Sequence, residues 1–155
     1  MGQQQLLLLV LATVIVGLAT VAGIQAFDEG QTQATQDALT QRALSIGNDI
    51  YAATQKPAQL GGVDISSNGN GKAYAAAAGY GSTKDGISAD GAGSNADCAL
   101  EADGSGTVTI ACAEKGGDIS GTSLSGNSPG EYAKVKVTSS GATVTNINGN
   151  TNVGS

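Results

Sequence analysis

The first 27 residues of this chain carry no charged side chain, and no other feature limits its fold as strongly. From Leu6 to Ile24, 19 consecutive residues are uncharged and mostly aliphatic. An α-helix of about 20 residues, rising 1.5 Å per residue, crosses the hydrocarbon core of a bilayer. Threonine hydroxyls bond to carbonyls of the preceding turn, and glycine is tolerated in membrane helices. The segment therefore predicts one transmembrane helix.

Three alternatives compete with this prediction. A cleaved secretory signal has a basic start and an apolar stretch of about 7–15 residues, whereas this run is longer and lacks Lys and Arg. An ordinary single-span anchor carries Lys or Arg on its cytoplasmic flank. A buried helix of a soluble protein needs a larger apolar partner than the polar remainder offers. Asp28 and Glu29 follow the apolar run and favour an N-terminus on the inner side.

Residues 28–54 extend the helical pattern but are apolar on one face only. Gln, Ala and Leu are good helix formers, and Pro57 with Gly61–Gly62 ends the pattern. We expect one helix of about 50 residues, some 75 Å long, with Gly30 and Gly47 as candidate bends. The apolar stripe recurs at helical spacing and consists of Ala34, Ala38, Leu39, Ala43, Ile46, Ile50 and Tyr51.

Residues 57–155 are rich in Gly, Ser, Asn, Asp and Thr and contain short β-prone runs. We expect strands over 106–113, 131–138 and 141–148, the last two forming a hairpin with Gly141 in its turn. Residues 72–80 are ambiguous, and we assign them to a strand. The predicted fold class is α+β. The expected parts are a core helix segment at 1–27, its amphipathic continuation at 28–56, and a small antiparallel β domain at 57–155.

The charge pattern excludes several functions. The net charge is −6, with seven basic residues, so a nucleic-acid partner is not predicted. The chain has no His, which removes the usual general base and imidazole ligand. Asp85, Asp90 and Asp97 lie among glycines without the spacing of an EF-hand loop. We expect no enzyme activity, no cofactor and no metal site.

A long helix, apolar first and amphipathic after, followed by a small β domain with a cysteine pair, resembles a type IV pilin. The residues that carry the resemblance are Gly2–Phe27, the helix to about Thr54, and Cys98 with Cys112. Pseudopilins and archaeal-type filament subunits share this pattern. The resemblance implies a subunit that sits in the cytoplasmic (inner) membrane and is assembled by an ATPase and a platform protein. The product would be an extracellular filament on the cell surface.

Pilins of this type carry a Glu at the fifth mature position, which pairs with a neighbour's amino terminus. Here glutamines stand in that region, so that charge pairing is not expected. Glutamine side chains instead hydrogen-bond across helices, at about 0.6–2 kcal/mol each. The predicted assembly helix comprises Gln3, Gln4, Gln5, Leu6, Leu7, Leu8, Leu9, Val10, Leu11, Val14, Ile15, Leu18, Val21, Ile24 and Phe27.

Cys98 and Cys112 are the only cysteines. In an exported protein such a pair forms a disulfide, whereas two free thiols would need a reducing compartment. The turn residues Asp103–Gly106 lie between them and allow the two cysteines to face each other across a hairpin. We therefore expect a disulfide that closes a loop of about 15 residues, worth roughly 3 kcal/mol.

The sequence thus predicts a structural subunit that polymerises with copies of itself into a type IV pilus-like filament. Membrane lipid is the expected partner before assembly. Two alternatives remain open. One is a membrane-anchored, pseudopilin-like surface or secretion protein, and the other is the coat protein of a filamentous virus.

Overall fold

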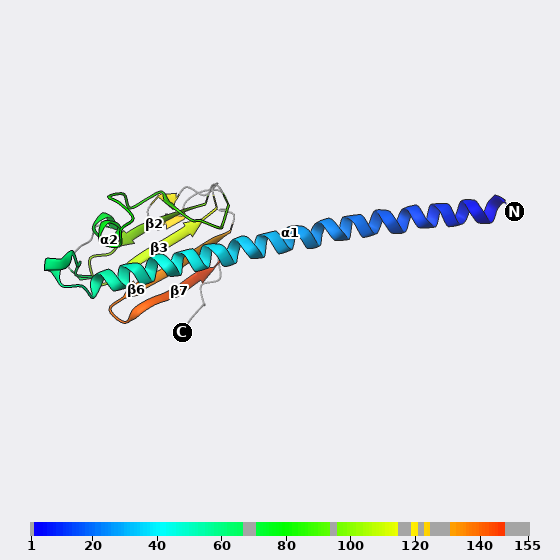
Figure 1. Ribbon diagram of the computed structural model, residues 1–155. Coiled ribbons are helices and arrows are strands. Elements are labelled where there is room, and N and C mark those ends of the chain that lie inside the picture. The colour runs from blue at the N-terminus through cyan, green and yellow to red at the C-terminus, as the bar shows by residue number, and fades with distance from the viewer. Residues whose placement is uncertain are drawn as a thin grey trace. The chain divides into compact units, whose positions relative to one another are not determined.

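The fold is given by a computed structural model that describes residues 2–66, 71–93, 96–114, 119–120, 123–124 and 131–147. The chain divides into two compact units, Met1–Ala34 and Thr35–Ser155. The first unit is helix alone. The second combines the end of the same helix with antiparallel strands (Figure 1). This confirms the predicted α+β class.

Helix α1 spans Gly2–Thr54 and is the longest element of the chain. Neither Gly30 nor Gly47 interrupts the helix. The helix ends just before Pro57, whose ring excludes it from a helix interior. A short 3-10 helix, η1, follows at Ala58–Leu60 and closes at Gly61, which adopts a left-handed conformation with φ of 80°.

Seven strands lie in the described part of the second unit. Five of them form one antiparallel sheet in the order β1-β2-β3-β6-β7. A separate pair, β4 and β5, is also antiparallel. The strands of the main sheet are β1 at Ile87–Ser88, β2 at Asp97–Ala102, β3 at Val108–Ala113, β6 at Tyr132–Thr138 and β7 at Gly141–Ile147, and the pair is β4 at Ile119–Ser120 and β5 at Ser123–Leu124.

The two predicted hairpins are present. β2 and β3 flank a turn in which the Asp103 carboxylate accepts backbone N–H bonds from Ser105 (2.8 Å) and Thr107 (3.0 Å). β6 and β7 are joined at Ser139–Ser140, and Gly141 takes a positive φ of 133° there. The part of the 141–148 prediction at residue 148 lies outside the described residues.

The core of the second unit lies between α1 and one face of the sheet (Figure 1). Alternate residues of the strands point to this face, as the period of two requires. The helix supplies the apolar stripe predicted from its sequence, and Leu39, Ala43, Ile46 and Ile50 are fully buried. The sheet side of the cluster is made of Ile87, Cys98, Leu100, Ala102, Val108, Ile110, Cys112, Ala133, Val135 and Val137.

Gly47 has a packing role that its sequence context did not reveal. A Cβ at this position would lie 3.0 Å from the Ala142 Cβ and 3.1 Å from the Val135 Cγ1. The missing side chain therefore lets α1 approach β6 and β7 closely. Interiors pack densely, and added methyl groups force neighbouring side chains and backbone to shift.

We expect Gly47→Val to lower the free energy of unfolding by about 1–3 kcal/mol because it overfills this contact. The measurement is the urea midpoint of the detergent-solubilised full chain. Asn48→Val is the matched control, since Asn48 is exposed on the same helix. Equal midpoints for the two variants would show that the close approach does not matter to stability.

The strand expected over 72–80 is wrong. Helix α2 spans Gly71–Ala77 instead. Alanine is the strongest helix former, and the alanine run decides the local structure over the β preference of tyrosine. Tyr74 is fully buried, and its hydroxyl donates to the carbonyls of Asp64 and Ile65 at 3.0 and 3.2 Å. The helix also packs tightly beside β2, because a Cβ on Gly71 would lie 2.5 Å from the Leu100 carbonyl oxygen.

Candidate assembly surface

The apolar side chains of the predicted assembly helix all lie on α1 and are all exposed. Their exposed fractions run from 52% at Leu11 to 79% at Phe27. Consecutive leucines at 6–9 already pass once around the helix, because a turn takes 3.6 residues. The predicted residues therefore do not converge on a pocket. They form an apolar sleeve around the whole helix, which we define as residues 6–27.

The two threonine hydroxyls of the sleeve are satisfied inside the helix. The Thr13 hydroxyl donates to the Val10 carbonyl, and the Thr20 hydroxyl donates to the Gly17 carbonyl, both at 2.8 Å. In an apolar surrounding an unpaired hydroxyl costs free energy, and these bonds remove that cost. α1 is the one helix among the described residues that is long and apolar enough to cross a membrane.

Gln3, Gln4 and Gln5 occupy the first turns of α1 and are exposed. The structure brings them to no partner within the described chain. Their amides can both donate and accept hydrogen bonds, so they suit contacts with a neighbouring helix rather than with this one. Their predicted role in contacts between copies stays a prediction.

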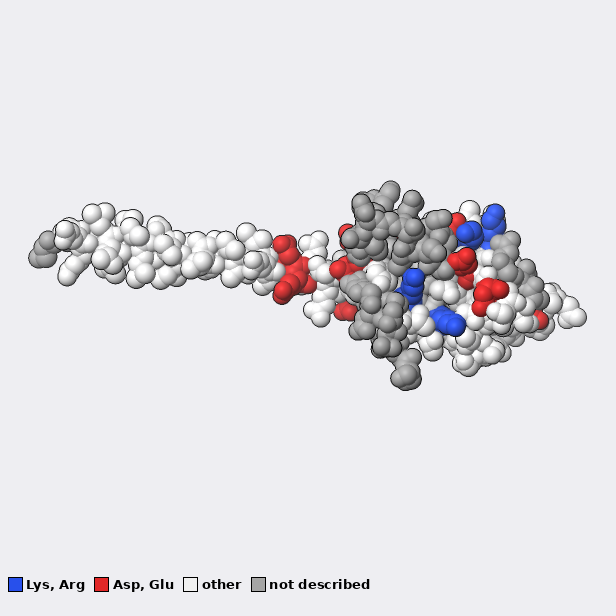
Figure 2. All heavy atoms as spheres, turned by 180° about the vertical axis from the view of Figure 1, so that it is seen from behind, with Lys and Arg blue, Asp and Glu red and all other residues white. Residues whose placement is uncertain are grey.

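The sleeve ends at a sharp charge boundary. Asp28 and Glu29 are the first charged side chains of the chain, and Figure 2 shows uncharged side chains along the helix up to the first acidic ones. Both are exposed, and neither has an ion-pair partner among the residues that the structure describes. Charges at this position limit how far the helix can enter an apolar surrounding.

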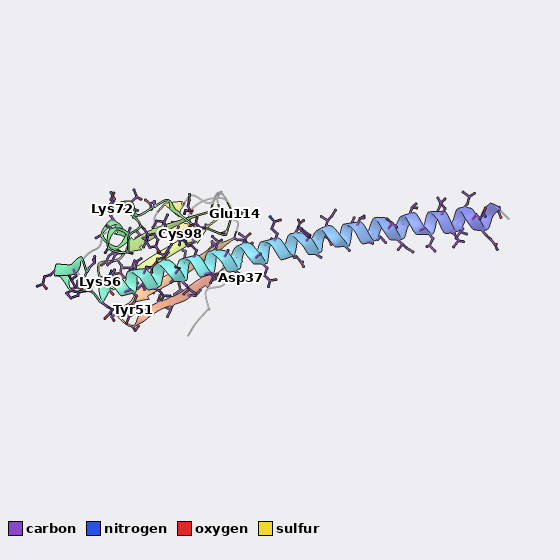
Figure 3. All side chains as sticks on the ribbon, viewed as in Figure 1. Asp37, Tyr51, Lys56, Lys72, Cys98 and Glu114 are labelled. Atoms are coloured by element: carbon purple, nitrogen blue, oxygen red, sulfur yellow. A yellow bond between two sulfur atoms is a disulfide. The ribbon has the colours of Figure 1, made fainter. Side chains whose placement is uncertain are left out.

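The disulfide predicted from the sequence is present in the second unit. Cys98 and Cys112 stand directly opposite each other on β2 and β3 and are joined through their sulfur atoms. Both are fully buried in the core against α1 (Figure 3 labels Cys98). The bond therefore ties together β2 and β3, two neighbouring strands of the main sheet.

A polar clamp that joins α1 to β1 and to Tyr80 was not predicted. The Arg42 side chain donates to the Ser88 carbonyl at 3.0 Å, and its guanidinium lies 5.6 Å from the centre of the Tyr80 ring. The Tyr80 hydroxyl donates in turn to the Asp49 carboxylate. Arg42 and Asp49 are seven residues apart and therefore share one side of the helix. Their partners are distant in sequence, so no local pattern predicts the clamp.

Burial, together with the hydrogen bond to Asp49, raises the pKa of Tyr80 from 10.0 to about 12. The pKa of Tyr80 is therefore higher in the folded protein than in the unfolded protein. The stabilisation is therefore complete below the unfolded pKa of 10.0 and is lost as the pH rises towards 12.

We expect wild type to lose more stability than Tyr80→Phe between pH 9 and pH 11, because only wild type has this hydroxyl to ionise. Chemical denaturation at both pH values measures the difference. Tyr51→Phe is the control, because the Tyr51 hydroxyl has no hydrogen-bond partner among the described residues. Identical losses in wild type and Tyr80→Phe would rule out the effect.

Among the residues that the structure describes, no group of three or more Cys, Asp or Glu side chains is placed to hold a metal ion. The chain matches no protein-family model, no curated protein and no solved structure at a significant level. Its function is therefore inferred from its own residues.

Proposed function

We propose that this chain is the structural subunit of an extracellular, type IV pilus-like filament, and that it polymerises through α1. The observation that carries the proposal is the apolar sleeve. Its large side chains are more than half exposed in the single chain, all around the helix. Burial of one such side chain away from water contributes about 1.5–3 kcal/mol. A free subunit in water is therefore strongly disfavoured, and the sleeve needs lipid or other copies of itself.

Helix packing in a filament core is supported by small residues on one side of the sleeve. Ala12, Ala19, Gly23 and Ala26 recur at steps of seven, four and three, so they share a helix face. A Cβ built on Gly23 meets nothing within 4 Å in the single chain. Small residues let neighbouring helix backbones approach closely in an apolar bundle. A head-to-tail contact that does not close produces an open helical fibre.

The second unit suits the outer shell of such a fibre. Its core is complete without the sleeve, since α1 from Leu39 onward is buried against the sheet. The net charge of −6 favours solubility and repulsion between neighbouring fibres at neutral pH. The disulfide is typical of an exported domain. On this proposal the subunit waits in the cytoplasmic membrane, and an ATPase with a platform protein delivers it to the growing filament.

One observation also favours a second candidate. α1 is long and apolar enough to cross a membrane by itself. A membrane-anchored, pseudopilin-like surface or secretion protein would keep its sleeve in lipid permanently. The two candidates share the first step, insertion in the membrane, and differ in whether the helices later leave the lipid.

Fractionation of the producing cells separates the candidates. Fibres are sheared from the cell surface, collected by centrifugation and analysed by mass spectrometry beside detergent-extracted membranes. We expect this chain in both fractions, and as a major component of the fibres. A chain recovered only from membranes, and never with sheared fibres, would refute the filament proposal and support the anchored protein.

A further inference from the structure

The turn that follows α1 is held in one conformation. The N–H of Leu60 and the N–H of Gly62 both donate to the Pro57 carbonyl, at 2.9 and 3.2 Å, and the Gly61 N–H donates to the Ala58 carbonyl at 3.2 Å. Gly61 has a positive φ of 80°, and a Cβ on Gly62 would lie 1.9 Å from the Lys56 carbonyl oxygen. Both positions favour glycine, and the three backbone hydrogen bonds hold the turn that presents Leu60.

This turn exposes Leu60, whose exposed fraction is 75%. From Thr35 onward, no other large hydrophobic side chain is exposed among those whose burial the structure describes. A single exposed leucine is common on protein surfaces. Here the leucine sits on a fixed turn beside a groove of about 440 Å³, whose apolar lining comes from Ala58, Val63 and Ile65.

Charge on the same surface is provided by Lys56 and Asp64, which also line the groove. Lys56 is exposed at the end of α1, where Figure 3 labels it, and no carboxylate in the described chain lies within ion-pair distance of it. The Asp64 carboxylate is engaged within its own loop, since it accepts from the N–H and hydroxyl of Ser66 at 2.9 and 2.7 Å. Leu60 and Lys56 thus offer an apolar and a basic group to a partner.

The end of the sleeve has the complementary pair of groups. Phe27 is the most exposed large hydrophobic residue of the described chain, at 79%, and it is followed directly by Asp28 and Glu29. The turn after α1 thus combines the apolar Leu60 with the basic Lys56. The end of the sleeve combines the apolar Phe27 with two acidic side chains. Complementary charge and buried apolar anchors are the two features that define a specific contact.

We propose that the turn of one copy, Lys56–Leu60, docks on the Phe27–Glu29 segment of a second copy. In this contact Phe27 packs against Leu60 and the apolar groove wall, and Asp28 or Glu29 pairs with Lys56. Every copy carries both patches, so the turn of each copy can bind the Phe27–Glu29 segment of the next. Two different patches joined head to tail give an open fibre when the rotation between successive copies does not close a ring. The inference rests on the proposed filament.

Cysteine crosslinking in the full-length protein tests the contact. The variant Phe27→Cys/Leu60→Cys is assembled in cells, oxidised and run on a non-reducing gel. We expect a ladder of dimers, trimers and larger species that collapses on mild reduction. Phe27→Cys/Asn48→Cys is the matched control, since Asn48 is exposed elsewhere on α1 and is expected to give no ladder. Fibres without a ladder would overturn the contact but leave the filament proposal intact.

A charge exchange tests the same contact without cysteines. We expect Lys56→Glu to reduce the yield of fibres about tenfold or more, because it opposes like charges across the contact. Adding Asp28→Lys and Glu29→Lys to this variant is expected to restore the yield. A Lys56→Glu variant that assembles like wild type would overturn the contact. Failure of wild type itself to form fibres would instead refute the filament proposal.

Discussion

Replacing Ile15 by lysine is expected to abolish fibre formation. Ile15 lies near the middle of the uncharged run and is 57% exposed in the single chain. In a filament core or in lipid its side chain is surrounded by apolar groups. A lysine at the centre of a membrane helix costs about 2.5–3.5 kcal/mol on insertion scales. That corresponds to roughly a 70- to 400-fold change in equilibrium.

Electron microscopy of sheared surface material, with immunoblotting of the same fraction, measures this effect. Ile15→Leu is the control, because it changes side-chain shape without adding a charge, and it is expected to assemble normally. Circular dichroism of the purified Ile15→Lys chain checks that the second unit still folds. Fibres from Ile15→Lys at the wild-type level would contradict a role of the sleeve in assembly.

Loss of the disulfide is expected to have the largest effect on the stability of the second unit. Closing a loop of about 15 residues contributes roughly 3 kcal/mol in the chain-entropy model. For a domain whose size lies between the small and the medium class, such a loss lowers the melting temperature by roughly 6–24 °C. The variant Cys98→Ala/Cys112→Ala removes the bond and leaves two small side chains in the core position.

Thermal unfolding of the detergent-solubilised variant, followed by circular dichroism, tests this expectation. Reductant provides the control. Once it has opened the bond, the melting temperature of wild type is expected to fall towards that of the variant. The melting temperature of the variant is expected to stay unchanged. Both cysteines are fully buried, so the reduction of folded wild type is expected to need prior unfolding. Equal melting temperatures of wild type and variant would show that the bond does not stabilise the domain.

The architecture of the chain could be predicted because its signals are local and periodic. The uncharged run at 6–24 and the stripe through Leu39, Ile46 and Ile50 describe a long helix with two kinds of surface, and α1 has both. The two glycine-containing turns placed the β2–β3 and β6–β7 hairpins. The cysteine pair then followed from the hairpin between its members.

The missed features depend on contacts between distant segments. Gly47 reads locally as a weak point of a helix, but its role comes from Val135 and Ala142, some 90 residues further along the chain. The strand expected over 72–80 rests on the β preference of its tyrosines, and the tertiary site that buries Tyr74 leaves no local signal in the sequence. The Arg42–Tyr80–Asp49 clamp joins residues with no shared local pattern.

The candidate assembly surface also has one part that the sequence predicts and one part that only the structure reveals. Exposure of the apolar sleeve follows directly from the sequence, because the rest of the chain is too polar and too small to cover it. The turn at Pro57–Gly62 was predicted as the end of a helix only. Its fixed hydrogen bonds, the exposure of Leu60 and the adjacent groove required the structure.

Cryo-electron microscopy of fibres sheared from the producing cells tests the central claim most directly. The account predicts helical density with a core of α-helices packed against one another, into which residues 6–27 of each copy can be traced, and an outer shell of the β domains. If the fibres contain another protein, or if every copy of this chain is found as a single helix surrounded by lipid or detergent, the account is contradicted.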